Sequence, residues 1–340
     1  MSDNIAVSVM LAPLRRRNHV LPFVVLLSWT WLAFVTTLYL SIILVVVGGL
    51  HFYIELMTQF AFRAPTRRKP PIEHEDWIST PFKTGHHHIQ SYVRLGRPDA
   101  PTAWICHGWT SGAQRMLGRA EVFVRDGWNV VMFDLPSHGG SSRLTKWTAE
   151  HSTTLLISAA NQLAKQRPEL FSNRLLFYGH SMGSFIGLRL SRRRNELEFD
   201  SFVSEWVFES PMTGYSEIFR ETCNILRIPM ILRPFVLANT LLHVNAIIGP
   251  SRFIGGLDDV DVPAWGMPDE PTLIIQANPD ERLGISHFER LKQAILDEDK
   301  EGLLEDYLVD GLTHNGAHTH AERDRIVSGW VKGRATYSSD

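Results

Sequence analysis

The sequence has few cysteines and no excess of either charge. Cys106 and Cys223 are the only cysteines among 340 residues, so we expect no disulfide framework of the kind that stabilises small secreted domains. The 34 Lys and Arg residues nearly balance the 36 Asp and Glu residues, for a formal net charge of -2. Nucleic-acid-binding domains usually carry a basic stripe or patch. The composition therefore argues against a nucleic-acid partner.

Charge is missing altogether from residues 21–50, LPFVVLLSWTWLAFVTTLYLSIILVVVGGL. As one helix this segment would be about 45 Å long, against a bilayer hydrocarbon core of about 30 Å. It is about twice as long as the apolar region of a signal peptide, and no small-x-small cleavage site follows it. We therefore predict a single-pass membrane anchor within residues 1–62. The following HFYIELMTQFAF is typical of an interfacial extension with aromatic residues.

Basic residues flank this anchor on both sides. They are Arg15, Arg16 and Arg17 before it, and Arg63, Arg67, Arg68 and Lys69 after it. The positive-inside rule therefore leaves the orientation in the membrane open. Residues 63–77 are charged and contain prolines, as linkers often do. The remaining residues, 78–340, are numerous enough to form one large domain.

Short apolar runs alternate with segments of helical periodicity after the linker. TAWICHG, NVVMFD, NRLLFYG and TLIIQAN read as strands, and AQRMLGRAEVFVRDG and TAEHSTTLLISAANQLAKQ read as helices. Repeated strand-helix-strand units with continuous apolar strands predict an α/β fold, a mostly parallel sheet with helices on both faces. In such sheets ligands bind beyond the carboxyl ends of the strands. We therefore expect the functional residues at these strand ends.

One of these strand ends carries a G-x-S-x-G motif, Gly179-His180-Ser181-Met182-Gly183. A serine on a sharp strand-to-helix turn is held in strained backbone geometry at the edge of the sheet. The helix that follows directs free N–H groups and the positive end of its dipole toward the turn. The same pentapeptide would also suit an ordinary turn. The motif alone therefore leaves open whether Ser181 is a nucleophile.

Two further motifs carry a resemblance to a known family. WICHGW ends one predicted strand, and FDLPSHGGSS follows another. Together with GHSMG, they resemble the serine branch of the α/β-hydrolase family over about residues 79–332, and GHSMG is shared with monoacylglycerol-lipase-like members. The resemblance implies that Ser181 is the nucleophile. It also implies an oxyanion hole made by the backbone N–H groups of Trp109 and Met182.

The same resemblance implies an acid and a histidine later in the chain, in the order serine, acid, histidine. Asp280 in TLIIQANPDERLG falls on the acid position, although Ala277 replaces the usual glycine of G-x-x-D. Glu209, after the strand EWVF, occupies an alternative acid position. His314 follows a predicted strand in YLVDGLTHNGAHTH and is the expected base. His318 in the same segment is the alternative base.

A helical cap at about residues 211–271 is also implied by the resemblance. This segment contains an apolar stretch interrupted by Pro229 and Pro234, which favours cap helices over a second membrane span. We expect no metal and no cofactor, because the histidine clusters lack zinc-motif spacing. These clusters are His86, His87 and His88, and His314, His318 and His320.

These features predict a membrane-anchored serine hydrolase. The expected substrate is a small or lipid-like carboxylic ester or related acyl compound, cleaved through an acyl-enzyme intermediate. Two alternatives stay open. One is an acyltransferase that uses the same three residues, and the other is a catalytically silent interaction module tethered to the membrane.

Overall fold

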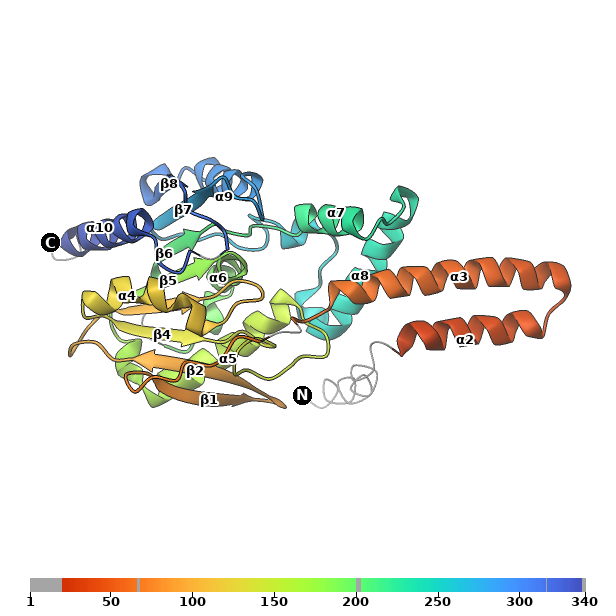
Figure 1. The fold of residues 1–340 in the computed structure, drawn as a ribbon, viewed down its shortest axis with the longest axis horizontal. Coiled ribbons are helices and arrows are strands. Elements are labelled where there is room, and N and C mark those ends of the chain that lie inside the picture. Colours follow the sequence, from red (N-terminus) through yellow and green to blue (C-terminus); the bar gives the residue numbers. More distant parts are fainter. Residues whose placement is uncertain (1–19, 66–67, 200–202, 316, 338–340) are drawn as a thin grey trace. The chain divides into compact units, whose positions relative to one another are not determined.

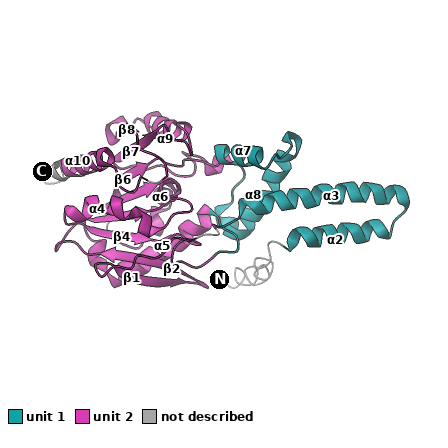
Figure 2. Ribbon diagram, viewed as in Figure 1, with its two compact units in different colours: residues 1–64, 144–148, 216–256 teal, residues 65–143, 149–215, 257–340 magenta. Residues whose placement is uncertain are grey.

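The structure is a computed structural model that describes residues 20–65, 68–199, 203–315 and 317–337 (Figure 1). The chain forms two compact units (Figure 2). The helical unit comprises residues 1–64, 144–148 and 216–256, and the sheet unit comprises residues 65–143, 149–215 and 257–340. The expected cap at 211–271 thus contributes its central part to the helical unit and its two ends to the sheet unit. The division into anchor, linker and hydrolase domain stays a prediction.

An eight-stranded sheet forms the centre of the sheet unit, in the order β1-β2-β4-β3-β5-β6-β7-β8. The β1–β2 and β2–β4 pairs are antiparallel and the other pairs are parallel. The predicted mostly parallel sheet is therefore confirmed. The strands are β1 (Ile78–Thr84), β2 (His87–Arg94), β3 (Thr102–Cys106), β4 (Asn129–Phe133), β5 (Leu175–His180), β6 (Val203–Glu209), β7 (Thr272–Asn278) and β8 (Leu304–Asp310).

Helices cover both faces of this sheet. They are α4 (Leu117–Arg125), α5 (Ala149–Gln166), α6 (Met182–Arg192), α9 (Ser286–Asp297) and α10 (Ala321–Tyr337). Short 3-10 turns are η1 (Ala113–Met116), η2 (Pro168–Leu170), η3 (Arg194–Glu196), η6 (Asp258–Val260) and η7 (Glu301–Leu303). Every residue of β3, β4 and β5 is buried. This agrees with their continuous apolar sequences, because strands covered on both faces have no side exposed to water.

Alternate side chains of each strand belong to different layers of the core. On one face, Ile105 and Tyr178 lie in a cluster with Phe123 of α4 and Trp330 of α10. The other face carries a row of neighbouring aromatic rings, Trp104, Phe133, Phe177, Trp206 and Phe208. α6 packs closely against β5 on this face, since a Cβ at Gly187 would lie 2.4 Å from the Phe177 ring. The two layers hold the strands from both sides.

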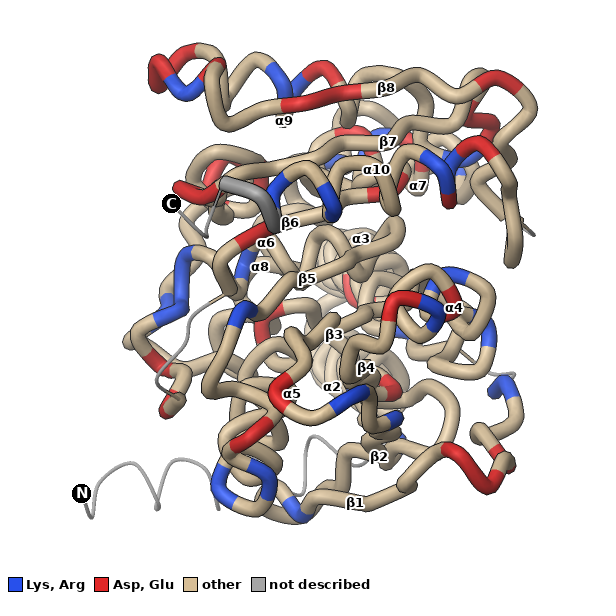
Figure 3. Tube along the Cα trace, turned by 90° about the vertical axis from the view of Figure 1, so that its left-hand side faces the viewer, with Lys and Arg blue, Asp and Glu red and all other residues tan. Residues whose placement is uncertain are grey.

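The expected linker contributes to this core. Ile72 and Trp77 are buried in the same cluster as Ile105, and Arg68 donates a 2.6 Å hydrogen bond to the carbonyl oxygen of Ser141. β3, β4, β5 and β7 carry no charged residue, whereas charged residues of both signs lie on the helices around the sheet (Figure 3). Residues 68–77 are therefore partly fixed within the sheet unit by apolar burial and the Arg68 hydrogen bond.

Four α-helices make up the described part of the helical unit: α2 (Leu21–Phe34), α3 (Leu38–Ala61), α7 (Ser216–Ile225) and α8 (Arg233–Ile248). Two short 3-10 turns flank α8, η4 (Met230–Leu232) and η5 (Pro250–Arg252). Two helical stretches, Leu38–Ala61 and Met230–Ile248, have the length and composition of a membrane span, properties that a soluble core helix can share.

Residues 21–50 do not form the single long helix expected from their uncharged sequence. The helix is broken at residues 35–37, and α2 and α3 form an antiparallel hairpin (Figure 1). The Trp29 indole donates a 3.1 Å hydrogen bond to His51 Nδ1, and the Phe23 and Phe52 rings lie 6.2 Å apart. A Cβ at Gly48 would lie 2.4 Å from Trp29 Cβ. The two arms on either side of the break therefore pack closely against each other.

The C-terminal half of α3 packs against α7 and α8. Buried Cys223, Ile228 and Val236 form a cluster with the partly buried side chains of Tyr53, Ile54 and Met57, among others. The expected interfacial segment 51–62 is therefore covered by protein along part of its surface.

A buried carboxylate adds a polar connection between α3 and α8. Glu55 is 3% exposed. Its carboxylate accepts a 2.9 Å hydrogen bond from the Asn239 amide and lies 3.1 Å from His243 Nε2. Apolar packing and the contacts of Glu55 therefore join α8 of the cap segment to α3.

Candidate active site

Ser181 lies on the turn between β5 and α6 in a backbone conformation that L-residues rarely adopt. β5 ends at His180, α6 begins at Met182, and Ser181 has φ 54° and ψ -117°. Such a conformation costs on the order of 1–3 kcal/mol and persists only where the surrounding structure imposes it. A Cβ at Gly183 would lie 2.2 Å from the Cys106 carbonyl oxygen. Glycine at this position therefore lets α6 approach β3.

Three of the predicted residues meet at this turn. The Ser181 Oγ lies 2.9 Å from His314 Nε2, and His314 Nδ1 lies 2.8 Å from Asp280 Oδ2. The side chains of His314 and Asp280 are 3% and 0% exposed. With the imidazole proton on Nδ1, His314 donates to Asp280 and accepts from the serine hydroxyl. The structure thus brings together residues that follow β5, β7 and β8.

The carboxylate of Asp280 is held by several donors. Its Oδ1 accepts hydrogen bonds from the backbone N–H groups of Arg282 and Leu283, at 2.9 and 2.8 Å. Its Oδ2 also accepts a 2.9 Å hydrogen bond from the Gln276 amide. Burial alone would raise the pKa of Asp280, but the hydrogen bonds from His314 and the two backbone amides lower it to about 2. Asp280 is therefore ionised at neutral pH.

Glu209, the alternative acid, belongs to a different cluster. Its carboxylate accepts two hydrogen bonds from the Arg119 guanidinium, at 2.6 and 2.5 Å, and one from the Tyr178 hydroxyl. Arg323 lies 3.6 Å away. Burial alone would raise the pKa of Glu209, but the charges of Arg119 and Arg323 hold it below its ordinary value. Its oxygens bind these groups, whereas His314 Nδ1 contacts Asp280.

His318, the alternative base, contacts a different residue. Its Nε2 lies 2.6 Å from the Arg115 guanidinium, and its Nδ1 lies 3.3 Å from the Arg115 carbonyl oxygen. The side chain is half-buried. Of the two candidate histidines, His314 is the one that contacts Ser181.

The two predicted oxyanion donors lie in segments next to Ser181. Met182 is the first residue of α6, a position whose backbone N–H has no acceptor within its own helix. Trp109 follows Gly108, where a Cβ would come 3.1 Å from Ser181 Cβ. The loop after β3 therefore approaches the nucleophile position closely.

Two buried histidines that sequence reasoning did not single out support this arrangement. His180 Nε2 donates a 3.1 Å hydrogen bond to the carbonyl oxygen of His314, and burial lowers the pKa of His180 to about 3. His107 Nε2 accepts a 3.0 Å hydrogen bond from the backbone N–H of Leu135, and burial lowers the pKa of His107 to about 4. Both are neutral at physiological pH. Their positions within the GHSMG and WICHGW motifs were visible in the sequence, but their distant partners were not.

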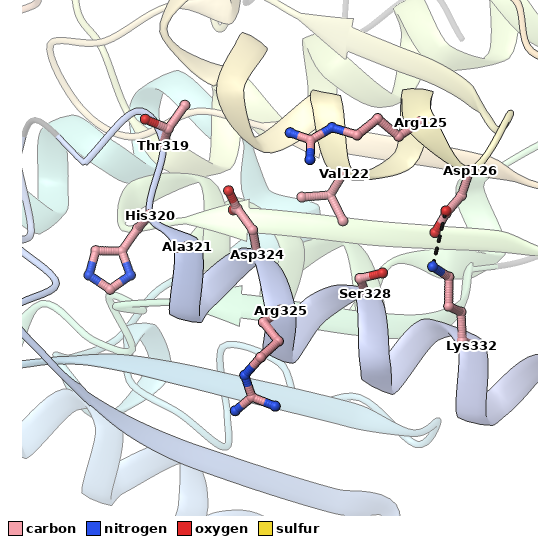
Figure 4. Close-up of a pocket in the computed structure, with 10 residues that line it drawn as sticks. All are labelled: Val122, Arg125, Asp126, Thr319, His320, Ala321, Asp324, Arg325, Ser328 and Lys332. Atoms are coloured by element: carbon pink, nitrogen blue, oxygen red, sulfur yellow. Dashed lines mark ion pairs between the residues drawn. The ribbon is translucent and has the colours of Figure 1, made fainter.

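A surface pocket of about 600 Å³ lies elsewhere in the sheet unit, between α4 and α10 (Figure 4). Arg125, Asp126, Arg325 and Lys332 are among the residues that line it, and Lys332 pairs with Asp126 at 3.2 Å. None of its lining residues is Ser181, Asp280 or His314. The pocket is therefore separate from the site at the strand ends.

Within the described residues, no three His, Cys, Asp or Glu side chains form a group suited to a metal ion.

Residues 99–241 match the family model described as serine aminopeptidase, S33. Among solved structures, the Pyrococcus furiosus esterase Pf2001 is similar, with a TM-score of 0.56 and 18% sequence identity over 80% of this chain and 97% of that chain. The structure of VinJ gives a TM-score of 0.50 and 16% identity over 75% of this chain and 98% of that chain. No curated protein matches the sequence significantly.

At these identities the structural similarity defines the fold. The order of the strands, the sharp turn at Ser181 and the solved neighbours agree on an α/β-hydrolase fold. The family model covers residues 99–241, which is less than half of the chain, and the sequence identity to the esterase neighbour is low, so these comparisons agree with the fold.

Proposed function

We propose that this chain is a membrane-anchored serine hydrolase that cleaves a carboxylic ester or related acyl compound. The observation that carries the proposal is the hydrogen-bonded series Ser181–His314–Asp280, with separations of 2.9 and 2.8 Å. A serine hydroxyl is a weak nucleophile at neutral pH and needs an adjacent base that a third group orients. The three side chains have this relation.

In the first half of the reaction, Ser181 Oγ attacks the carbonyl carbon of the substrate. Its proton passes to His314 Nε2, and the carbonyl oxygen takes the negative charge of the tetrahedral intermediate. The backbone N–H groups of Trp109 and Met182 are the proposed donors to this oxyanion. Loss of one such donor typically costs about 2.7–4 kcal/mol of transition-state stabilisation.

The intermediate then collapses, and His314 gives its proton to the departing alkoxide. An alcohol leaves, and the acyl group stays on Ser181 as an ester. Water repeats the sequence: His314 takes a proton from it, the hydroxide adds to the acyl carbon, and Ser181 leaves with the proton. Asp280 stays ionised and stabilises the imidazolium form of His314 in both halves.

The geometry favours Asp280 over Glu209 as the acid and His314 over His318 as the base. Glu209 is engaged by two arginines, which offset its negative charge. His318 contacts Arg115. These contacts support Asp280 and His314 in the two roles.

An ester substrate fits the chain better than the peptide suggested by the description of the matching family model. The structural neighbour with a TM-score of 0.56 is an esterase. The cap segment of the helical unit exposes large apolar side chains: Ile225, Met230, Ile231, Phe235, Leu242 and Phe253. Exposed apolar surface of this kind often marks a membrane or ligand contact. We therefore propose a lipid-like acyl substrate.

The proposal is tested by reacting the detergent-solubilised full-length protein with a fluorophosphonate probe. We expect covalent labelling of Ser181, loss of labelling in Ser181→Ala, and normal labelling in Ser172→Ala, where an exposed serine of the same unit is removed. Parallel assays with a p-nitrophenyl ester and an aminoacyl-nitroanilide distinguish ester from peptide-like substrates. Labelling without hydrolysis, but with acyl transfer to an added alcohol, would indicate an acyltransferase. A folded protein that does not react would indicate a silent module.

A further inference from the structure

The α2–α3 hairpin exposes apolar side chains along both arms over residues 21–50. Large hydrophobic residues from Phe23 to Leu50 are exposed, with Phe34 at 88% and Tyr39 at 83%. No Asp, Glu, Lys or Arg occurs between residues 21 and 50. A helix that is apolar on all sides belongs either inside a protein or inside a membrane. Because these side chains have no protein cover within the helical unit, a bilayer is the medium that suits them.

α2 is too short to cross that bilayer, and α3 is long enough only if its C-terminal half, which packs against the cap segment, is included. α2 has 14 residues, which is about 21 Å at 1.5 Å per residue. The uncovered part of α3, residues 38–50, is about 20 Å long by the same measure, because from Tyr53 onward α3 packs against the cap segment. A hydrocarbon core is about 30 Å thick, and apolar stretches of 10–14 residues form buried core helices, re-entrant or interfacial segments, or the apolar region of signal peptides. The exposure of these side chains argues against a buried core helix. The exposed parts of the two arms therefore reach past the middle of the core, and α3 continues into the part that the cap segment covers.

The turn of the hairpin has side-chain hydrogen bonds that suit an apolar surrounding. In hydrocarbon an unsatisfied backbone polar group is strongly unfavourable, and serine and threonine side chains can bond to freed carbonyl groups. At the turn, the hydroxyl groups of Thr36 and Ser41 donate to the Ala33 carbonyl oxygen in this way. Within α2, Ser28 and Thr30 donate to the carbonyl oxygens of Val24 and Leu26 in their own helix. Ser41, at the start of α3, thus bonds to the last turn of α2.

The basic residues fit a hairpin better than a single span. Arg15, Arg16 and Arg17 precede α2, and Arg63 follows α3. A single span would place these groups on opposite sides of the membrane, where the positive-inside rule has no asymmetry to act on. A hairpin places both at its open end, on one side. The symmetric charges are then the expected pattern.

We propose that α2 and α3 enter the membrane from one side and return to the same side, so that the N-terminus and the sheet unit share one compartment. This inference rests on the membrane attachment in the proposed function and changes its topology from a single pass to a re-entrant hairpin. The exposed apolar side chains then contact the lipid tails of one leaflet and of the middle of the bilayer.

The test counts accessible cysteines on each molecule. The double variant Ser2→Cys/Ser172→Cys is reconstituted as the full chain in sealed vesicles of phosphatidylcholine and phosphatidylglycerol. A membrane-impermeant maleimide is added, and intact mass spectrometry counts the labels. Ser172 is exposed in the sheet unit and precedes α8, so the count does not depend on that helix. The parent chain is the blank, because Cys106 and Cys223 are buried.

A hairpin gives molecules with two labels or none, whichever way they insert, whereas a single pass gives one label on every molecule. One label per molecule would overturn the hairpin and leave the proposed function standing. In the single variant Phe34→Cys, we expect labelling only after detergent is added. Labelling of Phe34→Cys in intact vesicles would show that the turn reaches water and would overturn the proposed depth.

Two further results separate this inference from the proposed function. Release of the protein from vesicles by alkaline carbonate would contradict the membrane attachment and with it the hairpin inference. If Phe34→Cys were then still protected in solution, a second copy of the chain would be the occupant. Failure of Ser181 to react with the fluorophosphonate probe would contradict the enzymatic proposal alone, since the label count does not involve that residue.

Discussion

β5 of the sheet unit and α3 of the helical unit have similarly apolar sequences and very different surroundings. All six residues of β5 are buried, whereas only 11% of the most apolar part of α3 is buried within the protein. An apolar run shows that a segment avoids water. It does not show whether protein or lipid replaces the water, and this depends on what the rest of the chain places around it.

The difference has a consequence for function. The sheet unit holds Ser181 in strained geometry through packing on both faces, and strain of this kind persists only in a rigid surrounding. The hairpin has few protein contacts along its exposed length and instead presents a surface. Catalytic chemistry and attachment are thus expected to respond separately to mutation, and the following experiments test that separation.

The largest effect is expected from Ser181→Ala. We expect turnover of a p-nitrophenyl ester to fall by about 10⁶-fold, the loss typical for removal of a triad serine. The thermal unfolding midpoint and the membrane-bound fraction should not change, because the alanine keeps the Cβ and removes only the hydroxyl. Esterase activity equal to that of the parent would remove Ser181 from the mechanism.

The next largest effect is expected from substitution of the catalytic histidine. His314→Ala should lose nearly as much activity as Ser181→Ala, because residues of one catalytic unit act non-additively. His318→Ala serves as its control and should retain most of the activity. Asp280→Asn should cost about 10⁴-fold by favouring the wrong imidazole tautomer. Steady-state kinetics on the same ester measure all three, and a larger loss in His318→Ala than in His314→Ala would reverse the assignment of the base.

Glu209→Gln tests the stability of the sheet unit. Removal of one partner of a buried ion pair typically costs about 3–5 kcal/mol, because the remaining charge is left buried. Glu121→Gln is the control, since Glu121 pairs with Arg125 at 3.4 Å on the exposed surface, where such pairs contribute about 0–1 kcal/mol. Chemical denaturation measures both. A Glu209→Gln protein that is stable but lacks activity at every substrate concentration would instead support Glu209 as the acid.

A smaller effect is expected in the hairpin. Gly48→Leu forces a side chain against Trp29, and such overpacking typically costs about 1–3 kcal/mol. Gly49→Leu is a matched control, because a Cβ at Gly49 has no neighbour within 4 Å. Thermal unfolding in detergent should show a lower midpoint for Gly48→Leu alone, with esterase activity unchanged in both. Equal midpoints would mean that the two arms are not packed together.

The smallest effect on catalysis is expected from a truncated chain that begins at Arg68. It retains the buried Ile72 and Trp77 and removes no strand, so turnover of a water-soluble ester should stay within about twofold of the parent value. The cap segment loses the packing of Tyr53, Ile54 and Met57. Hydrogen exchange should therefore accelerate in α8 and not in β5. Loss of protection in β5 would show that the two units do not respond separately.

Much of the sheet unit was predictable because its signals are local. Continuous apolar strands, helical periodicity and the order of the motifs predicted the parallel sheet. β1 was not predicted, because most of its residues are exposed and Pro81 interrupts its pattern. The hairpin break was also not predicted, since WLAFVTTLYL contains neither glycine nor proline. The packing of Gly48 against Trp29, about twenty residues apart, accompanies the break.

In the candidate site, too, some features follow from the local sequence and others from contacts between residues far apart in the chain. The residues that bear the chemistry could be proposed from short motifs, each read at one strand end. A choice between Asp280 and Glu209 required their partners, and these lie far away in sequence. Arg119 is 90 residues from Glu209, and His314 is 34 residues from Asp280.

The sequence by itself therefore determined the alternation of strands and helices, the serine on its turn, and the uncharged segment that avoids water. Only the tertiary structure decided which carboxylate meets His314, how His180 supports that histidine, and that the uncharged segment folds back on itself. The physical reason is the distance along the chain over which each effect acts. Backbone propensity and periodicity act over a few residues, whereas burial, charge neutralisation and close packing depend on groups that only the folded chain brings within contact distance.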